Sequence, residues 1–161
     1  MDIAHVKSLI DKNTIMILGS APNYPHGIND PIEELAKIAN KHKIGFHIDG
    51  CLGGFIGAFS KKHRHLYSLD RQGVTSISLD HHKFGLAPKG IGSIFYKTKE
   101  LRHAQYYINM DWIGGLYGTM TFPGSRPGFA SAAAWYSLLQ VTKTGYKENA
   151  KTIMEATQAG A

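Results

Sequence analysis

Apolar residues come in short runs along this chain, and the runs predict strands separated by turns and helices. Residues 15–18 (IMIL) end at a Gly-Ser-Ala-Pro turn, which is typical of a buried strand that enters a loop. Residues 44–49 (IGFHID) form a second apolar-rich run. Further strands are predicted at residues 73–79 and 92–97, which lie close enough in the sequence to be antiparallel neighbours.

A helix is predicted between the first two strands. Asp30 is expected to cap it, Pro31 to occupy its first position, and residues 41–43 to end it. An apolar stripe at helical spacing supports this helix and consists of Ile32, Leu35, Ala36 and Ala39. Strand, helix and strand then fit within about 35 residues, which indicates a right-handed parallel unit and an α/β fold.

The last third of the chain is predicted to be helical after a long loop. Residues 111–128 (DWIGGLYGTMTFPGSRPG) have the composition of a loop, whereas residues 129–141 are apolar at helical spacing. A second helix is predicted after the break at Thr144 and Gly145. The sequence shows no internal repeat and no low-complexity tract.

Composition limits the class of protein. The chain has 161 residues, of which 43% are hydrophobic, so it can bury a core. Its net charge of +6 is scattered without a dense basic run, so a phosphorylated small molecule suits it as well as nucleic acid does. The single cysteine, Cys51, excludes an internal disulfide framework and favours a cytoplasmic location. No apolar run approaches the ~20 residues of a membrane span.

Two reactive groups follow predicted strands. Asp49 comes directly after the second strand, and His82 and Lys83 follow the third, so these side chains are expected to meet where the carboxyl ends of parallel strands converge. Asp49 could equally be a turn residue, and Lys83 a solvated surface lysine. A lysine amine becomes nucleophilic only when it loses its proton, which partial burial or a charged His81 or His82 would favour.

An amine and a carboxylate in one pocket suit pyridoxal 5'-phosphate. The cofactor needs a lysine to form an imine and an aspartate to keep its pyridine nitrogen protonated. Its phosphate needs hydrogen-bond donors, and His82 could be one. Several serines could also serve, although each could be purely structural: Ser20, Ser76, Ser78 and Ser125.

A metal site is the alternative chemistry. Several residues near the strand ends are of ligand type: His47, Asp49, Asp80, His81 and His82. The Asp-His-His run also resembles the name motif of a manganese phosphoesterase family. The sequence has no upstream Asp-x-Asp segment to complete a two-metal site, so we expect no bound metal.

Three segments carry a family resemblance. Residues 19–55, 73–90 and 111–128 resemble the sphingosine-1-phosphate lyase family, within the fold-type I pyridoxal-phosphate decarboxylase group, and the similarity extends over about residues 14–157. The Asp and His-Lys motifs are shared with glutamate, tyrosine and aromatic amino-acid decarboxylases. The patterns P-H-G-x-x-D-P and D-W-x-G-G-x-Y are more specific to the lyases.

The resemblance implies a fold and an extent. The fold is the fold-type I pyridoxal-phosphate transferase-like large domain, a mostly parallel sheet flanked by helices. Residues 1–161 match the central part of that domain. The upstream region with the phosphate loop and the C-terminal small domain are expected to be absent from this chain.

The resemblance also implies roles for individual residues. Lys83 matches the catalytic Schiff-base lysine, and His82 the preceding histidine that helps to bind the cofactor phosphate. Asp49 matches the partner of the pyridine nitrogen, and Cys51 the small residue that packs against the cofactor ring.

Other positions are less certain or depart from the family pattern. Ser125 and Arg126 match a loop that borders the active site near the dimer interface, so they are candidate substrate or interface contacts. His81 stands where the family usually has a smaller residue such as Thr, and Gly50 where Ala is common.

The activity implied is retro-aldol cleavage of a phosphorylated sphingoid base to a fatty aldehyde and phosphoethanolamine. An amino-acid decarboxylase would use the same residues and is the first alternative. The second is a catalytically silent binding or dimerising module, because the isolated chain is expected to associate and to show weak or absent turnover. The resemblance further implies a homodimer, no nucleic-acid partner, and a location in the cytoplasm or on the cytosolic face of an internal membrane.

Overall fold

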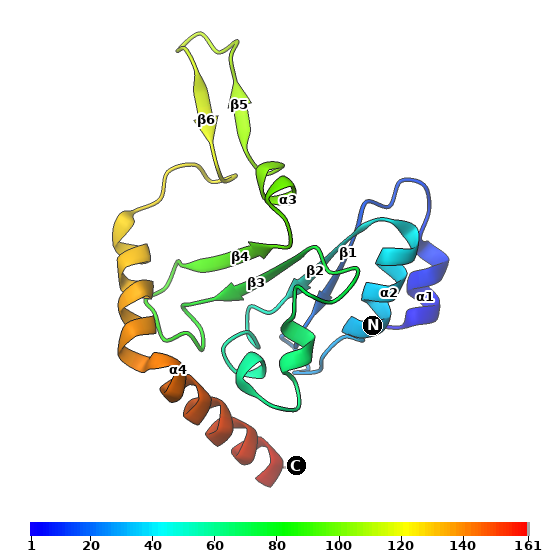
Figure 1. The fold of residues 1–161 in the computed structure, drawn as a ribbon, viewed down its shortest axis with the longest axis vertical. Helices are drawn as coiled ribbons and strands as arrows, with labels where there is room; N and C mark the ends of the chain where they lie inside the picture. The colour runs from blue at the N-terminus through cyan, green and yellow to red at the C-terminus, as the bar shows by residue number, and fades with distance from the viewer. Residues whose placement is uncertain (161) are drawn as a thin grey trace.

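A four-stranded mixed sheet forms the centre of the molecule. In the computed structural model, which describes residues 1–160, β1 (Met16–Ser20), β2 (Gly45–Asp49) and β3 (Ser76–Asp80) run parallel. Next to β3 lies β4 (Gly92–Tyr96), which is antiparallel to it (Figure 1). The four predicted strands and the antiparallel pairing are therefore confirmed.

Helix α2 (Ile32–His42) connects β1 to β2 as predicted, but its first turn differs from the expectation. The helix begins after Pro31 and has no side-chain cap. The prediction that Asp30 caps it was wrong, because the Asp30 carboxylate instead accepts a hydrogen bond of 2.8 Å from the backbone N–H of Ser20. Asp30 thus ties the loop before α2 to the end of β1.

The core lies between α2 and one face of the sheet. The helix buries its predicted stripe, since Ile32 and Leu35 are almost fully inaccessible to solvent. On the sheet side, Phe46 and Ile48 are fully buried, and Ile77 is nearly so. Because successive side chains of a strand point to opposite faces, His47 and Asp49 lie on the other face of β2.

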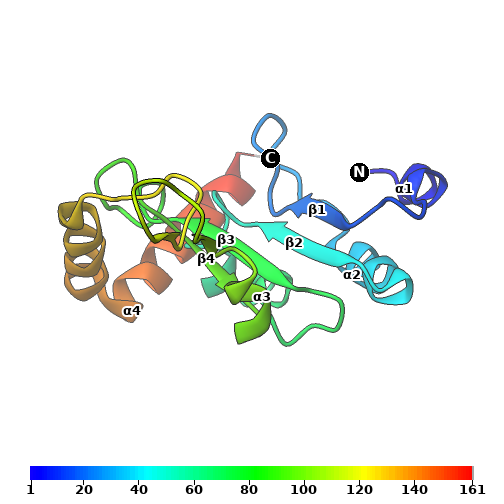
Figure 2. The ribbon, with the colours of Figure 1, turned by 90° about the horizontal axis from the view of Figure 1, so that it is seen from above.

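Several short elements surround the sheet, and the hydrophobic pattern had not predicted them. Figure 1 shows a β-hairpin that projects away from the rest of the chain, and its second strand lies in the segment that the sequence indicated as a loop. Figure 2 shows α1 and α2 on the opposite side of the molecule from the first half of α4. The short elements are α1 (Ile3–Leu9), η1 (Gly57–Phe59), η2 (Arg64–Tyr67), α3 (Lys99–His103), β5 (Tyr107–Asn109) and β6 (Tyr117–Thr119).

Helix α4 (Gly128–Ala159) is interrupted, as the sequence predicted. The interruption falls at Thr142, which has non-helical dihedrals (φ 62°, ψ 168°), two residues before the predicted break at Thr144. The hydroxyl oxygen of Thr142 accepts a hydrogen bond of 3.5 Å from the N–H of Gly145. A hydroxyl that accepts from an N–H three residues later is typical of a helix start, so Thr142 begins the second half of α4.

The second feature of α4 is its contact with the β3–β4 loop (residues 81–91). The hydroxyl of Tyr146 donates a hydrogen bond of 2.8 Å to the carbonyl oxygen of Gly85, and the hydroxyl of Ser137 donates one of 3.2 Å to that of Leu86. Leu86 has a positive φ of 59°, which disfavours a side chain of this kind. Helix α4 therefore stabilises a loop conformation that the local sequence does not favour.

We expect Tyr146→Phe to lower the free energy of unfolding by about 1–2 kcal/mol, because Tyr146 is buried and the substitution leaves the Gly85 carbonyl without its donor. Urea denaturation followed by circular dichroism measures this change. Tyr136→Phe, an exposed position in the same helix, is the matched control and should have almost no effect. Equal destabilisation by the two substitutions would contradict the role of the buried hydroxyl.

Candidate functional site

The carboxyl ends of β2 and β3 lie side by side and present an aspartate each. Asp49 is the last residue of β2 and pairs in register with Ser78, whereas Asp80 is the last residue of β3. The Oδ1 atom of Asp49 accepts a hydrogen bond of 2.9 Å from the backbone N–H of Cys51. The following turn thus fixes the carboxylate at the edge of the sheet, where ligands of α/β proteins bind.

Asp49 is ionised in this environment. Burial raises the pKa of its carboxyl group, but the hydrogen bonds from Cys51, the charge of His47 when its ring is protonated and the charge of Lys83 outweigh burial, so the net pKa is lowered. A carboxylate that stays charged when half-buried can pair with a cationic group of a ligand.

Lys83 lies beside this aspartate and is held as an ammonium ion. Its Nζ atom is 3.0 Å from Oδ2 of Asp80. The pKa of Lys83 is raised, first by the neighbouring Cys51 side chain and further by Asp80, and these effects outweigh the desolvation that lowers it. The hypothesis that charged histidines would depress the pKa of Lys83 was therefore wrong for this state of the protein, because a carboxylate contacts the amine.

His82 is fixed next to Lys83 by two neighbours. Its Nδ1 atom lies 2.8 Å from the carbonyl oxygen of Ile91, which can only accept, so Nδ1 carries the proton. Its Nε2 atom lies 3.6 Å from Oδ2 of Asp80. Asp80 thus contacts both His82 and Lys83, although sequence reasoning had considered it only as a metal ligand. Its position at a strand end, like that of Asp49, was the signal that could have indicated this role.

His81 points into the interior of the protein. It is 8% exposed, its Nε2 atom lies 2.7 Å from the hydroxyl of Ser93, and its ring packs edge-on against Phe55 at 5.2 Å. Burial lowers the pKa of His81, so the ring is neutral near pH 7. The larger side chain that replaces the usual Thr is therefore accommodated in the core.

Gly50 has a steric explanation. A Cβ atom at this position would lie 2.9 Å from the carbonyl oxygen of Ser78 and 3.3 Å from the ring of Tyr67. An alanine would therefore require these neighbours to shift. The close approach of this turn to β3 and Tyr67 accounts for glycine where the family commonly has alanine.

The remaining candidate site residues either lie apart from Asp49 and Lys83 or have side chains that already form hydrogen bonds. Ser125 and Arg126 are exposed in the segment between β6 and α4, and no hydrogen bond or ion pair within residues 1–160 links them to Asp49 or Lys83. Their role stays a prediction. The hydroxyls of Ser76 and Ser78, which the sequence offered as phosphate donors, lie 2.8 Å from Nδ1 and 3.1 Å from Nε2 of His47.

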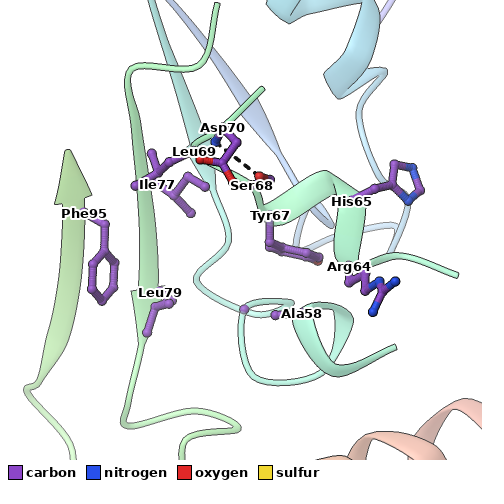
Figure 3. A pocket seen from close by; sticks show the side chains of 11 residues that line it. Ala58, Arg64, His65, Tyr67, Ser68, Leu69, Asp70, Ile77, Leu79 and Phe95 are labelled. Carbon is purple, nitrogen blue, oxygen red and sulfur yellow. Dashed lines mark hydrogen bonds between the residues drawn. The ribbon is translucent and has the colours of Figure 1, made fainter. Parts of the chain in front are cut away.

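A cavity of about 590 Å³ lies apart from the side chains of Asp49 and Lys83 (Figure 3). Figure 3 shows Ile77 and Leu79 of β3 facing this cavity, with Tyr67 on its other side. Ser76 and Ser78 alternate with these two residues along β3 and point to the opposite face. The cavity is therefore on the other side of the sheet from the Asp49 carboxylate.

Two further findings concern the part of the chain that the structure describes. Among residues 1–160, no three His, Cys, Asp or Glu side chains gather closely enough to hold a metal ion. None of the described helices combines the length and the apolar character that crossing a bilayer requires.

Comparison with known proteins shows the class to which the chain belongs. Residues 14–160 match the family model of the pyridoxal-dependent decarboxylase conserved domain, so the chain belongs to the pyridoxal-dependent decarboxylase family. Pyridoxal 5'-phosphate is the cofactor of this family, and the fold-type I architecture is confirmed.

The most similar relatives found include sphingosine-1-phosphate lyases. The lyase of Saccharomyces cerevisiae is 49% identical over 160 residues, which are 97% of this chain and 27% of that protein, and the lyase of Dictyostelium discoideum is 47% identical over 161 residues, which are 98% and 30%. The chain therefore spans less than a third of the length of these relatives. The structure of Burkholderia pseudomallei sphingosine-1-phosphate lyase aligns with a TM-score of 0.86 and 41% identity, over 96% of this chain and 36% of that one.

A second solved structure shares only the fold. Lactobacillus brevis glutamate decarboxylase aligns with a TM-score of 0.78 at 22% identity, over 94% of this chain and 35% of that one. The resemblance noted in the motifs is thus confirmed by sequence and structure.

The side chains at the strand ends fit the cofactor of the family. An ionised carboxylate from Asp49 can accept a hydrogen bond from a protonated ring nitrogen, and Lys83 provides a primary amine. The charge of Lys83 acts on Asp49, and the Cys51 side chain acts on both residues, so the three side chains share one site. The site therefore has a carboxylate for the ring nitrogen and an amine for covalent attachment of pyridoxal phosphate.

We expect Asp80→Asn to increase the reactivity of Lys83, because loss of the carboxylate removes one of the effects that raise the pKa of the amine. The unprotonated fraction at pH 8 should rise about threefold or more, which corresponds to a pKa change of about half a unit. Competitive acetylation as a function of pH, followed by peptide mass mapping, measures the pKa of Lys83. Asp70→Asn is the control, and an unchanged Lys83 titration in Asp80→Asn would refute the contact.

Proposed function

We propose that this chain forms part of the active site of a pyridoxal-phosphate-dependent lyase that cleaves a phosphorylated sphingoid base to a fatty aldehyde and phosphoethanolamine. The observation that carries the proposal is the convergence of Asp49 and Lys83 at adjoining strand ends, in a chain 49% identical to a sphingosine-1-phosphate lyase. Because the chain spans only part of its relatives, the substrate and the complete activity are inferences from them.

Each residue of the site has a task in this proposal. Lys83 attaches the cofactor through Nζ once its ammonium, which Oδ2 of Asp80 stabilises at 3.0 Å, has lost a proton. Asp49 stabilises a protonated pyridine nitrogen by its charge, and Cys51 packs beside the ring. The bound cofactor supplies an electron sink for the cleaved carbon–carbon bond.

His82 is the proposed contact for the cofactor phosphate. Its Nδ1 proton is used by the Ile91 carbonyl, so the ring can offer a second donor only when Nε2 is protonated. The Nε2 atom lies 3.6 Å from Oδ2 of the neighbouring Asp80.

Borohydride reduction of the chain with pyridoxal phosphate tests the site. We expect a reduced cofactor adduct on Lys83 above all other lysines, because among residues 1–160 it is the lysine whose charge acts on Asp49. Peptide mass mapping identifies the labelled residue. Lys83→Arg should abolish the specific adduct, and Asp49→Ala should reduce it at least tenfold, whereas Lys89→Arg in the same loop is the control. Uniform labelling of many lysines would refute the site in this chain.

The reaction itself is tested on the full-length protein that contains these residues. The proposed lyase should release a fatty aldehyde from a phosphorylated sphingoid base, as detected by mass spectrometry. Release of carbon dioxide from tyrosine, glutamate or aspartate, without aldehyde from the sphingoid base, would instead establish the amino-acid decarboxylase. Neither product, with Lys83 unlabelled by cofactor, would favour the catalytically silent module.

Assembly as a homodimer is also proposed, in the cytoplasm or at the cytosolic face of an internal membrane. The location rests on the single Cys51, which suits a reducing compartment. The dimer is supported by the β5–β6 hairpin and the segment that follows it, which expose a group of large apolar side chains. These side chains are Tyr107, Ile108, Met110, Trp112, Ile113, Leu116, Tyr117, Met120 and Phe122.

We expect the chain to sediment as a dimer or a larger species, and Ile113→Asp combined with Phe122→Asp to shift it towards monomer, because a buried unpaired carboxylate destabilises an interface. Analytical ultracentrifugation at several concentrations measures the shift. Tyr24→Asp, at an exposed position far from the hairpin in the sequence, is the control. A concentration-independent monomer for the unsubstituted chain would contradict self-association.

A further inference from the structure

His47 connects two serines to the site, although the proposed mechanism gives it no task. It lies in the middle of β2, two residues before Asp49, with its ring on the same face of the sheet. Its Nδ1 atom is 2.8 Å from the hydroxyl of Ser76, and its Nε2 atom is 3.1 Å from the hydroxyl of Ser78. Both ring nitrogens of this half-buried histidine are therefore occupied by neighbours on β3.

The network continues from Ser78 to Asp49. The hydroxyl of Ser78 donates to Oδ1 of Asp49 over 3.5 Å, which is long for a hydroxyl hydrogen bond and marks this link as the weakest. The stronger bond, from the N–H of Cys51, ends on the same oxygen at 2.9 Å. Both bonds thus end on Oδ1 and leave Oδ2 outside the network.

The direction of each hydrogen bond follows from the number of protons. Ser78 has one hydroxyl proton and uses it for Asp49, so its oxygen must accept from Nε2–H of His47. A neutral imidazole with its proton on Nε2 has a lone pair on Nδ1, which accepts from the hydroxyl of Ser76. Burial lowers the pKa of His47 against the raising effect of Asp49, which is consistent with the neutral ring.

The arrangement polarises the serine next to the carboxylate. A hydroxyl that accepts a hydrogen bond donates more strongly, because the bonds of a chain reinforce one another. Ser76 is 6% exposed, so water cannot easily replace it as the donor to Nδ1. His47 is thereby held in a single tautomer.

We propose that His47 is a positioning residue that acts through Ser78 to hold Oδ1 of Asp49, so that Oδ2 remains available to the protonated ring nitrogen of pyridoxal phosphate. The last clause rests on the proposed function, whereas the network itself is a property of the protein without cofactor. His47 touches neither the cofactor nor the reacting atoms in this scheme.

The test is nuclear magnetic resonance of the chain without cofactor. Long-range ¹H–¹⁵N spectra report the tautomer of His47, and the ¹³C shift of the Asp49 carboxyl as a function of pH reports its pKa, with assignments from His47→Gln and Asp49→Asn. We expect the Nε2–H tautomer near pH 7. Ser78→Ala should raise the pKa of Asp49 by about half a unit, because one donor to the carboxylate is lost.

Two substitutions of His47 separate positioning from packing. His47→Gln has a side-chain N–H that can replace Nε2–H as the donor to Ser78 but carries no charge, so the pKa of Asp49 should rise only through the loss of the His47 charge that lowers it. His47→Leu removes the donor as well as the charge and should therefore raise this pKa more than His47→Gln does. Amide spectra of each variant verify its fold, and the two His47 variants remain decisive if Ser78→Ala fails to fold.

The matched control is Ser93→Ala. Ser93 also contacts a buried imidazole, that of His81 at 2.7 Å, but this pair has no hydrogen bond to Asp49. The pKa of Asp49 should therefore be unchanged in Ser93→Ala. Equal Asp49 titrations in Ser78→Ala and Ser93→Ala, or an Nδ1–H tautomer of His47, would overturn the proposal.

A cofactor measurement separates this proposal from the proposed function. If the network orients Asp49 for the cofactor, Ser78→Ala and His47→Leu should each raise the dissociation constant of pyridoxal phosphate about threefold, and His47→Gln should not. If the original chain shows the network but no adduct on Lys83, the proposed function fails while the hydrogen-bonding of Asp49 stands. Unchanged cofactor affinity in all variants, with Lys83 labelled normally, overturns the positioning role alone.

Discussion

The parallel pairing of β2 with β3 is the constraint on which the site depends. The register places His47 opposite Ser76 and Asp49 opposite Ser78, and the N–H of Gly50 continues the ladder to the carbonyl of Ser78 at 2.9 Å. A slip by one residue would turn each of these side chains to the opposite face, because strand side chains alternate. The fully buried Phe46 and Ile48 resist such a slip, since it would expose them. The hydrophobic core thus fixes the position of the polar groups.

Charge balance is the second organising feature of the site. The Lys83 ammonium lies beside the carboxylate of Asp80, and its charge also acts on the carboxylate of Asp49. The ends of β2 and β3 thus each contribute one carboxylate that interacts with this ammonium. The two carboxylates have different tasks: Asp80 keeps the amine protonated, and Asp49 remains ionised through the N–H of Cys51. A nucleophilic lysine is thereby stored as a cation in the protein without ligand, which protects it from unselective reaction.

Much of the fold was predictable because its strands and helices follow from the order of apolar and polar residues within each short segment. The four strands and α2 follow apolar runs and a helical stripe, and the break in α4 was predicted within two residues, since the Thr-Gly sequence marks it. The failures concern contacts between distant residues. Asp30 is of a residue type that often caps helices, but its carboxylate accepts a hydrogen bond from the N–H of Ser20. The β5–β6 hairpin has neither a two-residue Asn-Gly turn nor a strict alternation of apolar and polar residues.

The site was predictable in part for the same reason. Asp49, His82 and Lys83 are recognisable by motif and by position after strands, whereas the direction of the pKa change of Lys83 depends on Asp80, three residues earlier, at a distance that the sequence does not give. Ser76 and Ser78 could be read as phosphate donors because their partner, His47, lies 29 and 31 residues away on another strand.

The contact of α4 with the β3–β4 loop has a consequence for the order in which the protein acquires its site. Gly85 and Tyr146 are separated by 61 residues, and Leu86 and Ser137 by 51. During synthesis from the N-terminus, the sheet strands and Lys83 leave the ribosome well before the hydroxyls that hold the Lys83 loop. Until the second half of α4 has been translated, the loop that carries Lys83 therefore lacks the hydrogen bond from Tyr146 to Gly85.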